Sequence, residues 1–173
     1  MRRSSVTIGM LIIFIVGFAA GKYFMLSYEN STFKSFYWLK DPIILNCHGE
    51  DMSLIRVKKA LRYWDDMGYE YKKYVHRPDK KACDGPKLIE GYVTLRKADP
   101  DQLDFDILAF TTRRHASAEM KGATIYFKKN TEGLELLLEH ELGHAYGFTH
   151  VTIPGHIMHP NYDIMGKRFW IPD

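Results

Sequence analysis

The stretch LEHELGHAYGFTH, Leu138–His150, contains three histidines within thirteen residues. His140 and His144 are four residues apart, so on a helix their imidazoles project from one face, one turn apart. That spacing lets two ring nitrogens converge on one metal ion. Glu141 follows the first histidine and can approach water beside the metal without occupying a ligand position. The pattern H-E-x-x-H therefore predicts a zinc site rather than a polar helix that is merely rich in histidine.

The motif continues beyond the second histidine. Gly147 and His150 follow His144 at intervals of three residues. A straight helix would carry His150 about 15 Å along the axis from His140. Glycine permits a positive φ at the C-terminus of a helix, so the chain can turn sharply there. Gly147 therefore predicts a turn that brings His150 back as a third metal ligand.

The extended pattern H-E-x-x-H-x-x-G-x-x-H is the zinc signature of metzincins, and Glu139–Tyr162 resembles this class of peptidases. Metzincins carry a methionine turn below the metal, and Met158 is the candidate. Its short separation from His150 is similar to that in matrixins, the branch related to matrix metalloproteinases. The resemblance implies a Zn²⁺ cofactor and Glu141 as the catalytic base. The metal ligands it implies are His140, His144 and His150.

Two segments resemble the substrate-binding parts of matrixins. DILAFTT, residues 106–112, is similar to the upper edge strand, to which a substrate adds by backbone pairing. The resemblance implies that Leu108 and Ala109 bind substrate there. The run MHPNY is similar to the matrixin pattern M-x-P-x-Y, which walls the pocket for the residue after the scissile bond. Pro160 and Tyr162 are the positions implied for that wall.

The function implied by this resemblance is hydrolysis of peptide bonds in protein or peptide substrates by water that zinc and Glu141 activate. Two other classes remain open: an inactive peptide-binding module, and a membrane-anchored structural protein in which zinc stabilises the fold. A structural zinc site needs four protein ligands, and His156 is the nearest candidate for a fourth. The net charge of +3 is mild, so we expect no nucleic-acid partner.

The first 26 residues predict a transmembrane anchor or a signal peptide. Arg2 and Arg3 precede an apolar run, and Val6–Leu26 is long enough to span a bilayer, which takes about 20 residues. Small residues near the end of the run also suit a signal peptidase. Both interpretations place the rest of the chain outside the cytoplasm, either in a single-pass membrane protein or secreted. We then expect residues 27–41 to form a stalk and residues 42–173 to form the metzincin-like peptidase domain.

The two cysteines, Cys47 and Cys83, both fall in this extracytoplasmic part. An oxidising compartment would permit a disulfide between them. Two unrelated buried thiols are the alternative, and the spacing alone does not choose between them.

The periodicity of apolar residues predicts an α+β fold, a zincin domain in which a mixed twisted sheet of about five strands packs against two helices. The first helix is expected over Met52–Met67, with Asp51 as N-cap and Gly68 as stop; the second begins near Leu134 and carries the zinc motif. The expected strands are residues 42–47, 69–75, 88–96, 105–113 and 123–129. Only fifteen residues follow Met158 in the sequence. They are too few for the long third helix of metzincins, so we expect Phe169, Trp170 and Ile171 to pack in its place.

Overall fold

The structure is a computed structural model that describes residues 33–172. The expected anchor or signal segment, residues 1–26, lies outside the described residues, as does the first part of the stalk. Within the described residues, no helix is both long enough and apolar enough to cross a membrane.

The described chain contains five strands and three helices. They are β1 (Ile43–Asn46), α2 (Leu54–Asp65), β2 (Lys73–Val75), α3 (Lys80–Asp84), β3 (Tyr92–Lys97), β4 (Ala109–Ala116), β5 (Glu119–Phe127) and α4 (Leu137–Ala145). The strands form one sheet in the order β2-β1-β3-β5-β4. All neighbouring pairs are parallel except β4 and β5, which are antiparallel. The mixed five-strand sheet predicted from the sequence is thus confirmed.

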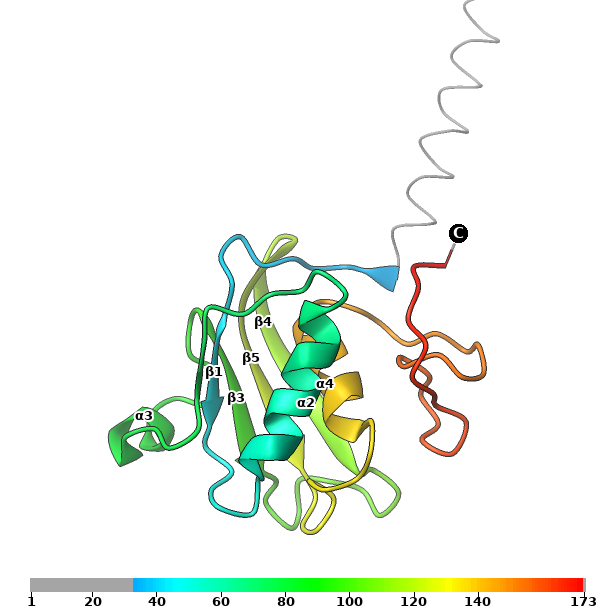
Figure 1. Cartoon of the computed structure of the whole chain (residues 1–173). Coiled ribbons are helices and arrows are strands. Elements are labelled where there is room, and N and C mark those ends of the chain that lie inside the picture. Colours follow the sequence, from blue (N-terminus) through cyan, green and yellow to red (C-terminus); the bar gives the residue numbers. More distant parts are fainter. Residues whose placement is uncertain (1–32, 173) are drawn as a thin grey trace, which may run out of the picture. The chain divides into compact units, whose positions relative to one another are not determined.

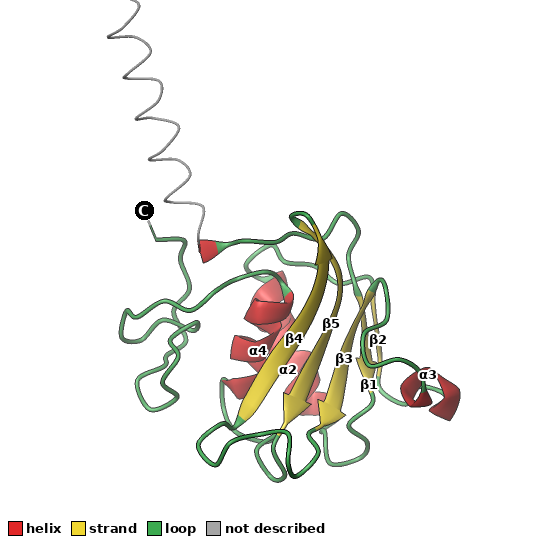
Figure 2. Ribbon diagram, turned by 180° about the vertical axis from the view of Figure 1, so that it is seen from behind, coloured by secondary structure: helices red, strands yellow, loops and turns green. Residues whose placement is uncertain are grey.

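The central strands form the core of the sheet. Parallel strands that are covered on both faces are rich in buried aliphatic residues, and Ile44, Val93, Leu95 and Ile125 are almost completely buried. In contrast, β4 lies at the edge of the sheet, beside β5 only (Figure 2). Its outer edge is therefore available for pairing with another extended chain.

Helices α2 and α4 cover the same face of the sheet (Figure 1). Along α2, Val57, Ala60, Leu61 and Trp64 recur at helical spacing and are fully buried. The helix begins later than expected, with Ser53 at the N-cap. The prediction that Asp51 caps α2 is wrong, because its carboxylate instead accepts a hydrogen bond from Lys97 Nζ at 2.5 Å.

The strand β4 also begins later than the alternation of residues suggests. The segment from Phe105 was expected to be extended, yet β4 begins at Ala109 and Phe105 is 97% exposed. The ammonium group of Lys128 donates hydrogen bonds to the backbone carbonyls of Asp104 and Phe105. These bonds hold the segment in a turn, since Ile107 N also donates to Asp104 O.

A disulfide joins Cys47, which directly follows β1, to Cys83 on the short helix α3. The spacing of the cysteines was compatible with a disulfide or with two separate thiols, and the structure contains the disulfide. It also contains the short helix α3, between the second and third expected strands, where no helix was expected. Asp79 caps this helix through a hydrogen bond from Lys81 N.

Residues 34–38, which sequence analysis placed in the stalk, belong to the compact unit Lys34–Trp170. Ser35 N donates to Gly147 O at 3.0 Å, and Trp38 Nε1 donates to Ala145 O at 2.9 Å. This segment therefore lies against the end of α4 and supports the chain where it leaves the helix.

Near the C-terminus of this unit, Phe169 packs on aromatic rings of the core. Its ring centroid lies 5.1 Å from that of Trp64 and 5.0 Å from that of Phe148. The same cluster includes Tyr69, whose ring contacts that of Phe148 edge-on. The expected packing is confirmed for Phe169 and for Trp170, whose ring contacts that of His156, whereas Ile171 is 56% exposed and does not pack as expected.

Candidate metal centre and cleft

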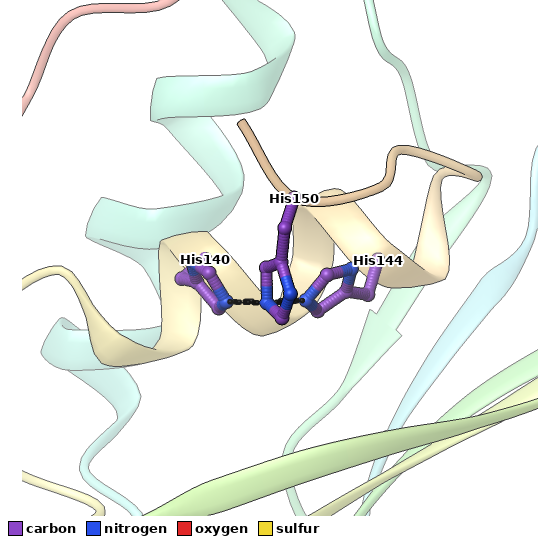
Figure 3. A group of neighbouring side chains, drawn as sticks. All are labelled: His140, His144 and His150. Carbon is purple, nitrogen blue, oxygen red and sulfur yellow. Dashed lines mark hydrogen bonds between the residues drawn. The ribbon is translucent and has the colours of Figure 1, made fainter. Parts of the chain in front are cut away.

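The three predicted histidines converge at one point (Figure 3). The Nε2 atom of His144 lies 3.1 Å from that of His140 and 3.1 Å from that of His150. The Nε2 atoms of His150 and His140 are 3.3 Å apart. Helix α4 supplies the first two rings one turn apart, and the loop after it supplies the third.

Hydrogen bonds set the orientation of the two helical rings. His140 Nδ1 donates to Ile157 O at 2.8 Å, and His144 Nδ1 donates to Phe148 O at 2.9 Å. A carbonyl oxygen only accepts, so Nδ1 carries the proton, and in the neutral ring Nε2 carries a lone pair. This arrangement is the usual support of a metal-binding histidine.

These contacts test whether the residues suit zinc. Burial lowers the pKa of His140 to about 4 and that of His144 to about 3, so both rings are neutral near pH 7. Their Nε2 lone pairs then face each other with no proton between them, an arrangement that favours a cation. Tetrahedral zinc with nitrogen ligands at about 2.05 Å separates them by about 3.3 Å, close to the observed spacing. The donor set fits zinc.

Gly147 produces the predicted turn. Its φ is +101°, and its backbone N–H donates to His144 O at 3.0 Å, closing the end of α4. The position is also crowded: a Cβ at Gly147 would lie 2.0 Å from Phe36 O. Both the backbone conformation and the close approach therefore require glycine, and the turn directs His150 back toward α4.

Met158 lies directly beneath the helix, fully buried. A Cβ placed on Gly143 would be 2.3 Å from Met158 Sδ, so the thioether packs against the turn of α4 between the two helical histidines. The candidate fourth ligand, His156, lies outside the histidine cluster. Its Nδ1 accepts from Met158 N at 3.0 Å, and its Nε2 lies 2.9 Å from Trp170 O.

Glu141 is buried beside the histidines and is held by the edge strand. Thr111 Oγ1 donates to Glu141 Oε2 at 2.6 Å and also contacts Glu141 O at 3.1 Å. Burial raises the pKa of Glu141 to about 7, while the bond from Thr111 opposes that shift. A cation on the histidines would lower the pKa of Glu141 by direct attraction. The carboxylate is therefore placed and oriented as a base.

A buried ion pair secures the start of α4. Arg56, on α2, donates to both oxygens of the Glu139 carboxylate, at 2.8 Å and 2.5 Å, and to Leu134 O at 3.1 Å. Trp64 Nε1 donates to Glu139 O at 2.7 Å. The residue directly before His140 is thus tied to α2 through both its side chain and its backbone.

A cleft of about 1050 Å³ runs between β4 and α4 and contains the histidine cluster and Glu141. All four residues predicted to bind substrate line it: Leu108, Ala109, Pro160 and Tyr162. Tyr162 is fixed by a hydrogen bond from its hydroxyl to Glu135 O at 3.0 Å. Leu108 directly precedes β4, and its carbonyl accepts from Lys128 N.

The contact of Thr111 with Glu141 and the position of Arg113 in this cleft were not predicted from the sequence. The available signal was the alternation of side chains in a strand, which places Ala109, Thr111 and Arg113 on one face. Burial lowers the pKa of Arg113, and its guanidinium lies over the ring of Phe36.

The mixed sheet, the helix that carries two of the histidines and the cleft beside an edge strand define a metzincin-like zinc peptidase domain. More specifically, the chain belongs to the matrixin family, whose family model matches residues 66–173. The match begins one residue after α2 ends, so β1 and α2 lie outside it. A search of curated protein sequences found no match. The resemblance to matrixins inferred from the zinc motif is thus confirmed.

Proposed function

We propose that this chain is a zinc-dependent endopeptidase that hydrolyses peptide bonds of proteins outside the cytoplasm. The observation that carries the proposal is the set of three imidazoles whose Nε2 atoms face one another beside Glu141, in a cleft along an unpaired strand edge. His140, His144 and His150 would hold the metal. Membership of the matrixin family, which is zinc-dependent, supports this assignment.

In this mechanism the outer edge of β4 binds the substrate as an extended strand through backbone hydrogen bonds. When zinc is bound, the site gains a Lewis acid that polarises the scissile carbonyl and makes water acidic near pH 7. Glu141 accepts the proton of the attacking water and passes it to the leaving amine. Thr111 holds one carboxylate oxygen, which leaves the other oxygen to face the reacting atoms.

We further propose that the domain acts outside the cytoplasm, tethered by residues 1–26 or released after their cleavage. The disulfide between Cys47 and Cys83 supports this location, because such bonds persist in oxidising compartments.

Removing the metal tests the proposed function directly. We expect the purified full chain to bind about one zinc per molecule and to cleave a mixed peptide library. Treatment with 1,10-phenanthroline should abolish cleavage, and added zinc should restore it, because the protein groups alone lack the Lewis acid. The measurements are metal content and the cleavage products by mass spectrometry.

The matched controls are two histidine variants. His144→Ala should lose both the zinc and the activity, whereas His115→Ala, at an exposed position on β4, should keep both. Stoichiometric zinc without cleavage of any peptide would contradict the proposal and favour a module that only binds peptides.

Thr111→Val tests how Glu141 is positioned. We expect kcat to fall about tenfold, because the charge-assisted hydrogen bond to Glu141 Oε2 is lost. Zinc content should stay unchanged, since Thr111 contacts no histidine of the cluster. Thr112→Val removes a hydroxyl on the opposite face of the same strand and should leave kcat unchanged. Equal losses in the two variants would show a general effect on β4 instead.

A further inference from the structure

The wall of the cleft carries charged side chains of both signs. Arg113 lines the end beside the C-terminus of α4, and Asp106 and Asp163 line other parts of the cleft wall. Arg113 Nη1 donates to Phe148 O at 3.4 Å, just beyond the last residue of α4. Tyr162, in contrast, is bonded to Glu135 O, just before the first residue of α4. The catalytic Glu141 lies between these two anchors, in the middle of the helix.

Arg113 has no carboxylate partner among residues 33–172, although it is half-buried. Its neighbour Arg114 points to the opposite face of β4 and forms an ion pair with Glu90 at 3.2 Å. A guanidinium has five N–H donors, and the long bond to Phe148 O uses one of them. The others remain available to a group that enters the cleft.

The order of residues along β4 indicates on which side of the scissile bond the guanidinium of Arg113 lies. Side chains on one face of a strand are two residues apart, about 6.8 Å. Thr111 contacts Glu141, so it marks the position of the chemistry, and Arg113 lies one such step further along β4. The resemblance to matrixins implies that Pro160 and Tyr162 wall the pocket for the residue after the scissile bond, and Tyr162 is anchored at the start of α4, on the other side of Glu141 from Arg113. Arg113 therefore faces the substrate residues that precede the scissile bond.

We propose that Arg113 is a specificity-determining residue that selects polypeptides with aspartate or glutamate within the three residues before the scissile bond. A carboxylate there accepts bidentate hydrogen bonds from the guanidinium, which otherwise has no counter-ion. Asp106, which precedes β4, and Asp163, which follows Tyr162, also line the cleft and disfavour an acidic residue after the bond. This inference rests on the proposed endopeptidase function and adds the substrate class to it.

The first test is the amino-acid preference of the wild-type full chain on a peptide library. We expect Asp and Glu to be enriched on the amino side of the cleaved bonds and depleted on the carboxyl side. A general attraction by the net positive charge would enrich both sides alike and would overturn the inference. Cleavage with no charge preference would also overturn it while leaving the proposed function intact. Absence of any cleavage would reject the function itself, and the inference with it.

The second test pairs enzyme variants with two peptides that differ only by Asp or Asn at the preferred position. For the wild type, kcat/KM should be about tenfold higher for the Asp peptide, and Arg113→Gln should abolish that difference. Arg113→Lys should retain part of it, because the charge remains. Arg114→Gln, the adjacent control on the opposite face, should behave like the wild type. If Arg113→Gln slowed both peptides equally with zinc content unchanged, Arg113 would be only structural and the inference would be wrong.

Discussion

Glu141→Gln is expected to reduce kcat/KM for peptide cleavage by about 10²–10⁴-fold, the usual contribution of a general base. The amide has nearly the same shape and can still accept the hydrogen bond from Thr111, so the helix and cleft should be preserved. What it lacks is a lone pair basic enough to take a proton from water. The loss should therefore appear in kcat, with KM nearly unchanged.

Three measurements make this result specific. Zinc content should remain about one per chain, because the three histidines are untouched. The thermal unfolding midpoint should stay within a few degrees of the wild type. Glu70→Gln, at an exposed position away from the cleft, should retain full activity. Activity within a few-fold of the wild type in Glu141→Gln would mean that another group serves as the base.

The zinc motif could be read from the sequence because its geometry is local. The spacing of His140 and His144 follows from one helical turn, and the return of His150 follows from a glycine that adopts a positive φ. No distant residue is needed to predict either feature. The methionine turn could not be predicted from spacing alone, because nothing in the spacing shows that Met158 packs against Gly143. The resemblance to metzincins was needed to identify Met158 as the methionine of this turn.

The contacts that orient the site could not be predicted, because they join residues far apart in the chain. Thr111 and Glu141 are 30 positions apart, and Arg56 and Glu139 are 83 apart. Their meeting depends on how β4 and α2 lie on α4, which apolar periodicity does not specify. The start of β4 was predicted too early for the same reason. Lys128 donates hydrogen bonds to two backbone carbonyls of a loop that lies more than twenty residues earlier in the chain.

The disulfide illustrates a limit of a different kind. Cysteine spacing shows only that Cys47 and Cys83 are 36 positions apart in the chain, whereas bond formation requires their Cα atoms to be close. In the structure these atoms are 5.4 Å apart. That distance arises because the parallel pairing of β1 with β2 brings the segment before α3 alongside the end of β1.

Gly147→Ala is expected to destabilise the domain by about 4 kcal/mol and to abolish zinc binding. Two effects add at this position. A φ of +101° costs a residue with a Cβ roughly 1–3 kcal/mol, and the new Cβ would lie 2.0 Å from Phe36 O, a backbone atom that cannot rotate away. Relief of the clash requires the chain to move either at Phe36 or at the turn that positions His150.

Two other glycines separate the contributions. Gly68 has a φ of +81° with open space around it, so Gly68→Ala should cost only about 1–2 kcal/mol. Gly133 is exposed with nothing near its Cβ position, so Gly133→Ala should be nearly neutral. Neither variant should alter zinc content. Urea unfolding and metal analysis of the three variants would give the order Gly147→Ala, Gly68→Ala, Gly133→Ala in loss of stability. A Gly147→Ala protein with the stability of Gly68→Ala and a full complement of zinc would show that the turn tolerates a side chain, and that another feature brings His150 to the metal.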